Sequence, residues 1–123
     1  MTQSKELLAI IEVIPENFAD PAADFQAVRD MFAPFHGHPT SDELEIEIAD
    51  YGGVRCGSYT LKGADHKYTA FHCHGGAFVS SGLDEYHFYA EIIARQIGCS
   101  VVMPDYRLAP EHPYPAAADD CFH

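Results

Sequence analysis

The spacing of apolar positions changes twice in the middle of the chain. Residues 67–73 carry the aromatic and β-branched side chains of a buried strand. From Asp84 the apolar positions recur at helical spacing as far as Gly98, and we expect Asp84 to cap this helix and Gly98 to end it. Residues 100–103 then predict a second short strand. A strand, a helix and a strand in this order predict a βαβ unit with parallel, neighbouring strands.

A strict alternation of apolar residues and glutamates precedes this unit. It runs through residues 43–48 and predicts a half-exposed strand, and residues 54–61 predict a second strand after a turn at Tyr51-Gly52-Gly53. Together they predict an antiparallel hairpin at the edge of the sheet. Glutamates that face water there discourage pairing with another sheet.

Two helices are predicted before the hairpin. Residues 4–14 place apolar side chains on one face, and Pro15 ends that helix. The second helix has Asp20 as its candidate cap, Pro21 at its first position and a stripe of apolar residues: Phe25, Val28, Met31, Phe32 and Phe35. Such a stripe normally indicates a face buried in a core.

A glycine-containing loop, His74-Gly75-Gly76-Ala77-Phe78, lies between the predicted strand and helix of the βαβ unit. A strand that turns into Gly-Gly exposes consecutive backbone N–H groups, because glycine permits dihedral angles that other residues resist. Such a loop binds an anion or a developing oxyanion. We expect the His74 imidazole to hydrogen-bond nearby backbone and hold the loop, so that Gly76 and Ala77 can aim their N–H groups.

Other candidate chemistry in the same region is weaker. Ser80 and Ser81 do not lie on a strand-to-helix turn with glycines two residues to either side, where an activated serine is found. His72, Cys73 and His74 are potential metal ligands, but no further pair with suitable spacing completes a zinc site. We therefore expect no metal and no cofactor.

A proline-rich segment, residues 104–115, follows the second strand of the βαβ unit and leads into a helix from Ala116. Within it, Arg107 together with Asp105 and Glu111 is either a site for a substrate carboxylate or an ion-pair cluster that braces the loop. Interior arginines are usually paired, so we expect the bracing role.

The composition is that of one small globular domain, with 123 residues of which 47% are hydrophobic. A net charge of −12 with scattered basic residues disfavours a nucleic-acid partner. The cysteines at 56, 73, 99 and 121 lack the spacing of a disulfide framework, and the early apolar run is too short to span a membrane. No signal-peptide pattern is present, so we expect a cytoplasmic protein without a membrane span.

Two motifs stand on either side of the predicted helix of the βαβ unit. The first is His74-Gly75-Gly76-Ala77-Phe78, and the second is Asp105-Tyr106-Arg107-Leu108-Ala109-Pro110-Glu111-His112-Pro113-Tyr114-Pro115-Ala116-Ala117. Together they resemble the hormone-sensitive-lipase family of α/β-hydrolase esterases. The resemblance implies that Gly75, Gly76 and Ala77 supply an oxyanion hole and that His74 supports their loop. Ala77 stands where the family has a third glycine, and it keeps the backbone N–H.

The fold implied by this resemblance is the N-terminal half of an α/β-hydrolase, a mostly parallel sheet with flanking helices that stops before the nucleophile strand. Residues 1–40 are then an N-terminal helical cap segment, and residues 41–123 are the incomplete core. No Gly-x-Ser-x-Gly occurs in the sequence, and the helix that starts at Ala116 is short. We therefore expect the catalytic triad to lie beyond His123.

The activity implied is hydrolysis of small carboxylic esters through an acyl-enzyme, with this chain inactive by itself. The expected partners are the ester and the remainder of the fold, from the same or a second polypeptide, with a homo-oligomer also possible. Two alternatives stay open. One is a non-catalytic, hydrolase-like ligand-binding protein, and the other is a truncated form without a stable fold.

Overall fold

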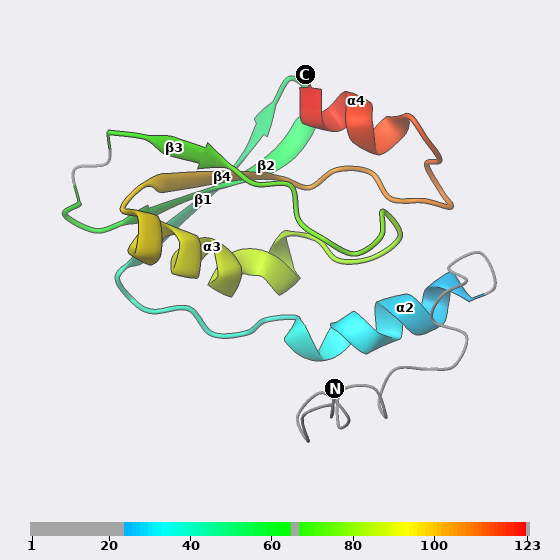
Figure 1. The fold of residues 1–123 in the computed structure, drawn as a ribbon, viewed down its shortest axis with the longest axis horizontal. Coiled ribbons are helices and arrows are strands. Elements are labelled where there is room, and N and C mark those ends of the chain that lie inside the picture. Colours follow the sequence, from blue (N-terminus) through cyan, green and yellow to red (C-terminus); the bar gives the residue numbers. More distant parts are fainter. Residues whose placement is uncertain (1–23, 65–66, 123) are drawn as a thin grey trace, which may run out of the picture.

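The structure, a computed structural model, describes residues 24–64 and 67–122. Their elements are a four-stranded sheet with helices on both sides. Figure 1 shows α3 on one face of the sheet, α4 on the other, and α2 beyond α3. The bounds in chain order are α2 Phe25–Phe32, η1 Ala33–Phe35 (a short 3-10 helix), β1 Leu44–Tyr51, β2 Val54–Leu61, β3 Thr69–Phe71, α3 Leu83–Ile97, β4 Ser100–Pro104 and α4 Ala116–Phe122.

The strands β1 and β2 form the predicted antiparallel hairpin, which closes with Tyr51 opposite Val54. The two turn residues, Gly52 and Gly53, have positive φ angles of 64° and 92°, as a two-residue hairpin turn requires. The Asp50 carboxylate accepts the Gly53 N–H at 2.8 Å. β1 lies at an edge of the sheet, as predicted, and its exposed glutamates face water.

The strand order is β1-β2-β4-β3, and the predicted βαβ unit is confirmed, because β3 and β4 are parallel neighbours joined through α3. Within this chain the sheet is mixed rather than mostly parallel, since the hairpin contributes two antiparallel pairings. β3 is shorter than the expected 67–73. Regular pairing ends at Phe71, after which the His72 N–H bonds the Val102 carbonyl at 2.8 Å and the chain leaves the sheet.

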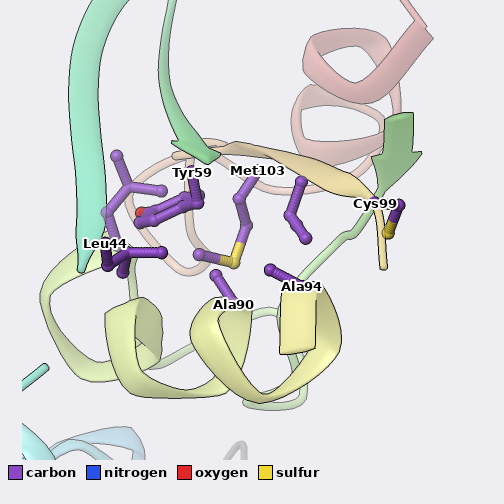
Figure 2. Close-up of a cluster of buried hydrophobic side chains, with 8 residues drawn as sticks. Leu44, Tyr59, Ala90, Ala94, Cys99 and Met103 are labelled. Atoms are coloured by element: carbon purple, nitrogen blue, oxygen red, sulfur yellow. The ribbon is translucent and has the colours of Figure 1, made fainter. Parts of the chain in front are cut away.

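The core lies between the sheet and α3. Figure 2 shows Tyr59 and Met103, from neighbouring strands, close to Ala90 and Ala94 of the helix. All four residues are fully buried. Alanine at these positions lets the helix approach the sheet closely, and the buried Tyr59 hydroxyl is satisfied by His87 Nδ1 at 2.8 Å.

Helix α3 ends as predicted but begins differently. Gly98 has a left-handed φ of 70° and stops the helix. The helix starts at Leu83, so Gly82 occupies the cap position and Asp84 lies in the first turn. The prediction of an Asp84 cap was wrong, because the Leu83 N–H is bound instead by the Asp105 carboxylate, at 3.3 Å, from just beyond β4.

Helix α2 is the described part of the second predicted N-terminal helix. It begins at Phe25, where the Asp24 carboxylate caps it by accepting the Ala27 N–H at 3.0 Å. The candidate cap at Asp20 and the whole first predicted helix lie outside the described residues. Val28 of the apolar stripe is buried, in line with the expected core face.

Helix α4 begins at Ala116, as predicted, after the proline-rich segment has carried the chain from the end of β4 to the opposite face of the sheet. None of the helices in the described part of the chain is both long and apolar enough to cross a membrane.

Candidate functional site

The loop after β3 makes a tight turn through three successive residues with positive φ. These are Gly76, Ala77 and Phe78, at 126°, 55° and 63°. The Gly76 carbonyl closes the turn by accepting the N–H groups of Val79 and Ser80 at 3.1 and 3.0 Å, and it also accepts the Ser80 hydroxyl at 3.1 Å. These hydrogen bonds hold the backbone of the loop in one conformation.

Gly76 cannot carry a side chain in this turn. A Cβ atom there would collide with the Ser80 carbonyl oxygen and lie 2.9 Å from Ser80 Oγ. Ala77, which stands at the third glycine position of the resembled family, tolerates its left-handed φ at a cost of roughly 1–2 kcal/mol for a non-glycine residue. Ala77 thus keeps its backbone N–H within the turn.

The N–H groups of Gly75, Gly76 and Ala77 make no hydrogen bond to any residue that the structure describes. Gly75 and Ala77 are exposed, and Gly76 is half-buried. The structure thus brings the three predicted residues together on one loop whose donors are available to a ligand. Their assignment as an oxyanion hole stays a prediction.

His74 and Tyr106 together support this loop. His74 is buried, and its Nδ1 lies 2.8 Å from the Gly75 carbonyl oxygen, a backbone contact of the kind expected from the sequence. The Tyr106 ring stacks on the His74 ring with centroids 4.1 Å apart and an interplanar angle of 9°. The Tyr106 hydroxyl donates to the His74 carbonyl oxygen at 2.6 Å. Sequence reasoning missed this contact, and the motif that contains Tyr106 was its only signal.

Burial favours the neutral form of the histidines beside the loop. It lowers the pKa of His74, an effect that the Gly75 carbonyl contact only partly opposes, and it also lowers the pKa of His72. The Nε2 atoms of both rings are buried and have no hydrogen-bond partner among the described residues. A proton added there would have no acceptor, so these side chains are suited to position the loop rather than to carry charge.

A pocket of about 390 Å³ opens beside Gly75, between α3 and the end of α2. Its lining is mainly aromatic and comes from both helices as well as from the strand end. The lining residues are Phe32, His72, Gly75, Glu85, Tyr86, Phe88 and Tyr89.

Arg29 fastens α2 to the two loops around the site. Its Nε donates to the Val79 carbonyl at 2.8 Å, and its Nη2 donates to the Ala109 carbonyl at 3.2 Å. Its guanidinium also forms a two-point ion pair with Glu111, at 2.8 and 2.7 Å, which lowers the pKa of Glu111 to about 2. No local pattern in the sequence indicates this contact, because the partners lie 50 to 82 positions away.

Arg107 braces the proline-rich segment, but with another partner than expected. It binds Asp120 of α4 through its Nε and Nη2 atoms, the shortest contact being 2.7 Å, and its backbone N–H donates to the same carboxylate at 2.9 Å. Asp105 pairs instead with Arg55 of β2, and Glu111 is the partner of α2 described above. The expected cluster with Asp105 and Glu111 was wrong, because the segment folds back against α4.

The remaining candidate groups have structural surroundings. Ser80 is buried with its hydroxyl on the Gly76 carbonyl, and Ser81 Oγ is buried without a hydrogen-bond partner among the described residues. Among residues 24–64 and 67–122 no three His, Cys, Asp or Glu side chains are grouped as metal ligands would be.

Comparison with known proteins agrees with this architecture. Residues 70–123 match the family model described as the alpha/beta hydrolase fold. Versiconal hemiacetal acetate esterase from Dothistroma septosporum is 33% identical over 96 residues, which cover 77% of this chain and 28% of that protein. Lipase 2 from a Moraxella species is 37% identical over 82 residues, which cover 62% of this chain and 19% of that protein.

Solved structures give the same result over nearly the whole chain. A crystal structure of an esterase from the bacterial hormone-sensitive lipase family superposes with a TM-score of 0.70 at 31% identity, and the match covers 99% of this chain and 41% of that one. A hormone-sensitive lipase from a metagenome library gives a TM-score of 0.66 at 28% identity, covering 83% and 40%. The chain therefore spans about two fifths of the length of these solved relatives.

The fold and the matched segment place this chain among the α/β-hydrolases. Within that class the proteins it is similar to are esterases and lipases, and the solved ones named above are a hormone-sensitive lipase and an esterase of that family, in agreement with the motifs around α3.

Proposed function

We propose that this chain is the N-terminal part of a serine carboxylesterase and that it supplies the oxyanion hole but not the nucleophile. The observation that carries this proposal is the loop of Gly75, Gly76 and Ala77, whose three N–H groups have no hydrogen-bond partner among residues 24–64 and 67–122 while Tyr106 fixes the preceding His74 carbonyl. The named relatives are an esterase and a lipase, which supports ester hydrolysis as the reaction.

The loop would act when a serine attacks the ester carbonyl. The carbonyl oxygen then becomes a tetrahedral oxyanion, and donors that are already aimed at its position stabilise it without reorganising. The Gly76 turn and the stacked His74–Tyr106 pair supply that prior order. Since His74 is buried with its Nδ1 on the Gly75 carbonyl, its role in this proposal is to position the loop rather than to transfer a proton.

The pocket beside Gly75 points to the substrate class. Its volume of about 390 Å³ and its aromatic lining suit a small apolar acyl or alcohol group. Phe32 of α2 is part of that lining, so the segment 1–40 acts in this proposal as a cap that selects the substrate. Residues 41–123 form the portion of the core that holds the loop.

The rest of the fold, including the nucleophile, comes in this proposal from further residues of the same polypeptide or from a second one. A cytoplasmic location belongs to the same proposal and rests on the sequence alone.

A chimera tests the oxyanion-hole assignment. Residues 1–123 replace the equivalent segment of a hormone-sensitive-lipase-family esterase, and hydrolysis of p-nitrophenyl butyrate is measured. We expect the chimera to turn over the ester and the Gly76→Pro variant to lose at least on the order of 10²- to 10³-fold in kcat, because proline removes one donor and cannot adopt the φ of 126° that the turn requires. Circular dichroism establishes that each protein is folded. A folded Gly76→Pro chimera with an unchanged rate would place the oxyanion hole elsewhere.

A further inference from the structure

Two cysteines that the proposed reaction does not use lie against each other behind the loop. Cys73 follows β3 and directly precedes His74, and Cys121 lies in the last turn of α4. Their Sγ atoms are 3.6 Å apart although the residues are 48 positions apart in the sequence. Both thiols are free in this structure.

We propose that Cys73 and Cys121 form a reversible intramolecular disulfide when the protein meets a low-molecular-weight disulfide such as oxidised glutathione. A disulfide bond is about 2.0 Å long, so the two sulfurs need to approach by about 1.6 Å from their present separation of 3.6 Å. Cys73 is held between the bonded His72 N–H and the His74 carbonyl, so most of this movement falls to Cys121, which lies in the last turn of a short helix. The proposal does not depend on the esterase assignment.

Exposure sets the order of the steps. Cys73 is exposed and meets the oxidant first, whereas Cys121 is only half-exposed. Burial, together with the contact to Cys73, raises the pKa of Cys121 to about 12, which makes it the poorer first nucleophile. Once Cys73 has reacted, its part in that shift is gone while the larger effect of burial remains, and the closeness of the two sulfurs makes Cys121 the resolving group.

The electrons balance over two exchange steps. The Cys73 thiolate attacks one sulfur of oxidised glutathione, which forms a mixed disulfide and releases one glutathione thiolate. The Cys121 thiolate then attacks the Cys73 sulfur, forms the internal disulfide and releases the second glutathione. The two cysteine sulfurs are oxidised by two electrons in total, one glutathione disulfide is reduced to two thiols, and the two cysteine protons pass to the glutathione sulfurs.

The bond would join the strand end beside the oxyanion loop to α4 on the other face of the sheet. Cys73 lies one residue before His74, whose ring and carbonyl hold the loop, so a shift of Cys73 reaches Gly75 directly. The other two cysteines, Cys56 and Cys99, are buried and serve as internal controls.

Disulfide mapping of the 123-residue chain tests the proposal. Dilute protein is equilibrated in glutathione redox buffer, its remaining thiols are blocked with N-ethylmaleimide, and its linked peptides are identified by mass spectrometry. Of the six possible pairings of the four cysteines, we expect Cys73–Cys121 to exceed every other at least tenfold and to disappear on addition of dithiothreitol. The Cys99→Ala control should keep this linkage, whereas Cys121→Ser should instead carry a glutathione on Cys73.

The same experiment in urea shows whether the fold directs the pairing. There we expect the preference for Cys73–Cys121 to vanish and the pairings to become mixed. A mixed pattern in native buffer as well, which an unfolded chain would also give, overturns the proposal. Linkage between chains, or no linkage at all, overturns it too.

Discussion

Tyr106 holds His74 at two points: its hydroxyl donates to the His74 carbonyl at 2.6 Å, and its ring stacks on the imidazole 4.1 Å away. The two residues are 32 positions apart and come from different motifs of the chain. One motif supplies the loop with the available N–H donors, and the other supplies the side chain that fixes it. This explains in physical terms why the two motifs occur together on either side of α3.

Replacement of Tyr106 by phenylalanine should therefore destabilise the fold. Tyr106 is 5% exposed. Removal of its hydroxyl leaves the carbonyl oxygen of the buried His74 without this hydrogen-bond donor, at a cost of about 1–3 kcal/mol. The free energy of unfolding of Tyr106→Phe, from urea denaturation, measures this cost. Tyr114→Phe is the matched control, because Tyr114 is 90% exposed and should lose no more than a few tenths of a kcal/mol. Equal stability of Tyr106→Phe and the original protein would contradict a stabilising role for the Tyr106–His74 hydrogen bond.

The hairpin and the βαβ unit were predictable because each depends on signals close together in the sequence. The period-two run of β1, the Gly52-Gly53 turn and the stop at Gly98 are such signals, and the strand, the turn and the stop are confirmed. The expected half-burial of β1 is wrong within this chain, because Ile46 and Ile48 are exposed as the glutamates are. The start of α3 was not predictable in the same way. Its first N–H is bound by Asp105, 22 positions later, so the local acidic residue at 84 was a misleading signal.

The candidate site shows the same division. The loop with Gly76 could be located from the sequence, because only glycine suits a position with this positive φ and with the Ser80 carbonyl so close. The contacts of Arg29, by contrast, join segments that only the tertiary fold brings together. Periodicity and motif spacing contain no information on such pairs, and for this reason the partner of Arg107 was also mistaken.

A side chain at Gly76 should be more harmful than one at another left-handed glycine. Gly76→Ala adds a collision with the Ser80 carbonyl to the strain of φ 126°, whereas Gly37→Ala, at φ 67°, meets no atom within 4 Å. We expect Gly76→Ala to lower the free energy of unfolding by about 1–3 kcal/mol more than Gly37→Ala does. Urea denaturation of both variants measures the difference. Similar losses would show that conformation alone, and not the packing on Ser80, requires glycine there.

Loss of Arg29 should loosen α2 without disturbing the sheet. Arg29→Gln gives up the ion pair with Glu111 and at least one of the bonds to the Val79 and Ala109 carbonyls. We expect amide hydrogen exchange in α2 to accelerate on the order of tenfold, while exchange in β2 and β4 stays the same. Asp30→Asn is the matched control on the same helix, because the Asp30 side chain hydrogen-bonds only to the nearby Gln26 among the described residues. Equal exchange in α2 of both variants would contradict the anchoring role.

Acid should weaken the fold through His74. Burial makes the pKa of His74 lower in the folded than in the unfolded chain, so the unfolded state binds more protons as the pH falls below about 6.5. Stability is fully present above that pH and is lost as the pH falls towards the folded pKa. We expect the Tm of the original protein to drop more steeply between about pH 6.5 and 5 than that of His74→Gln, which does not titrate. His72, whose pKa is lowered for the same reason, contributes a loss that both proteins share. Parallel Tm profiles would contradict a buried neutral imidazole at 74.

The 123-residue chain by itself should self-associate through β3 and hydrolyse no ester. β3 lies at an edge of the sheet with Phe71 56% exposed, and an apolar edge of this kind recruits another strand. Sedimentation velocity should show dimers or larger species. Hydrolysis of p-nitrophenyl acetate should stay at its background rate, because the sequence has no Gly-x-Ser-x-Gly nucleophile.

Phe71→Lys places a charge on this edge and should shift the chain towards monomer. Ile48→Lys is the matched control on the opposite edge strand, where Ile48 is 42% exposed, and should leave the association unchanged. If the original chain is a monomer, or if both lysine variants dissociate it equally, the β3 edge is not the contact.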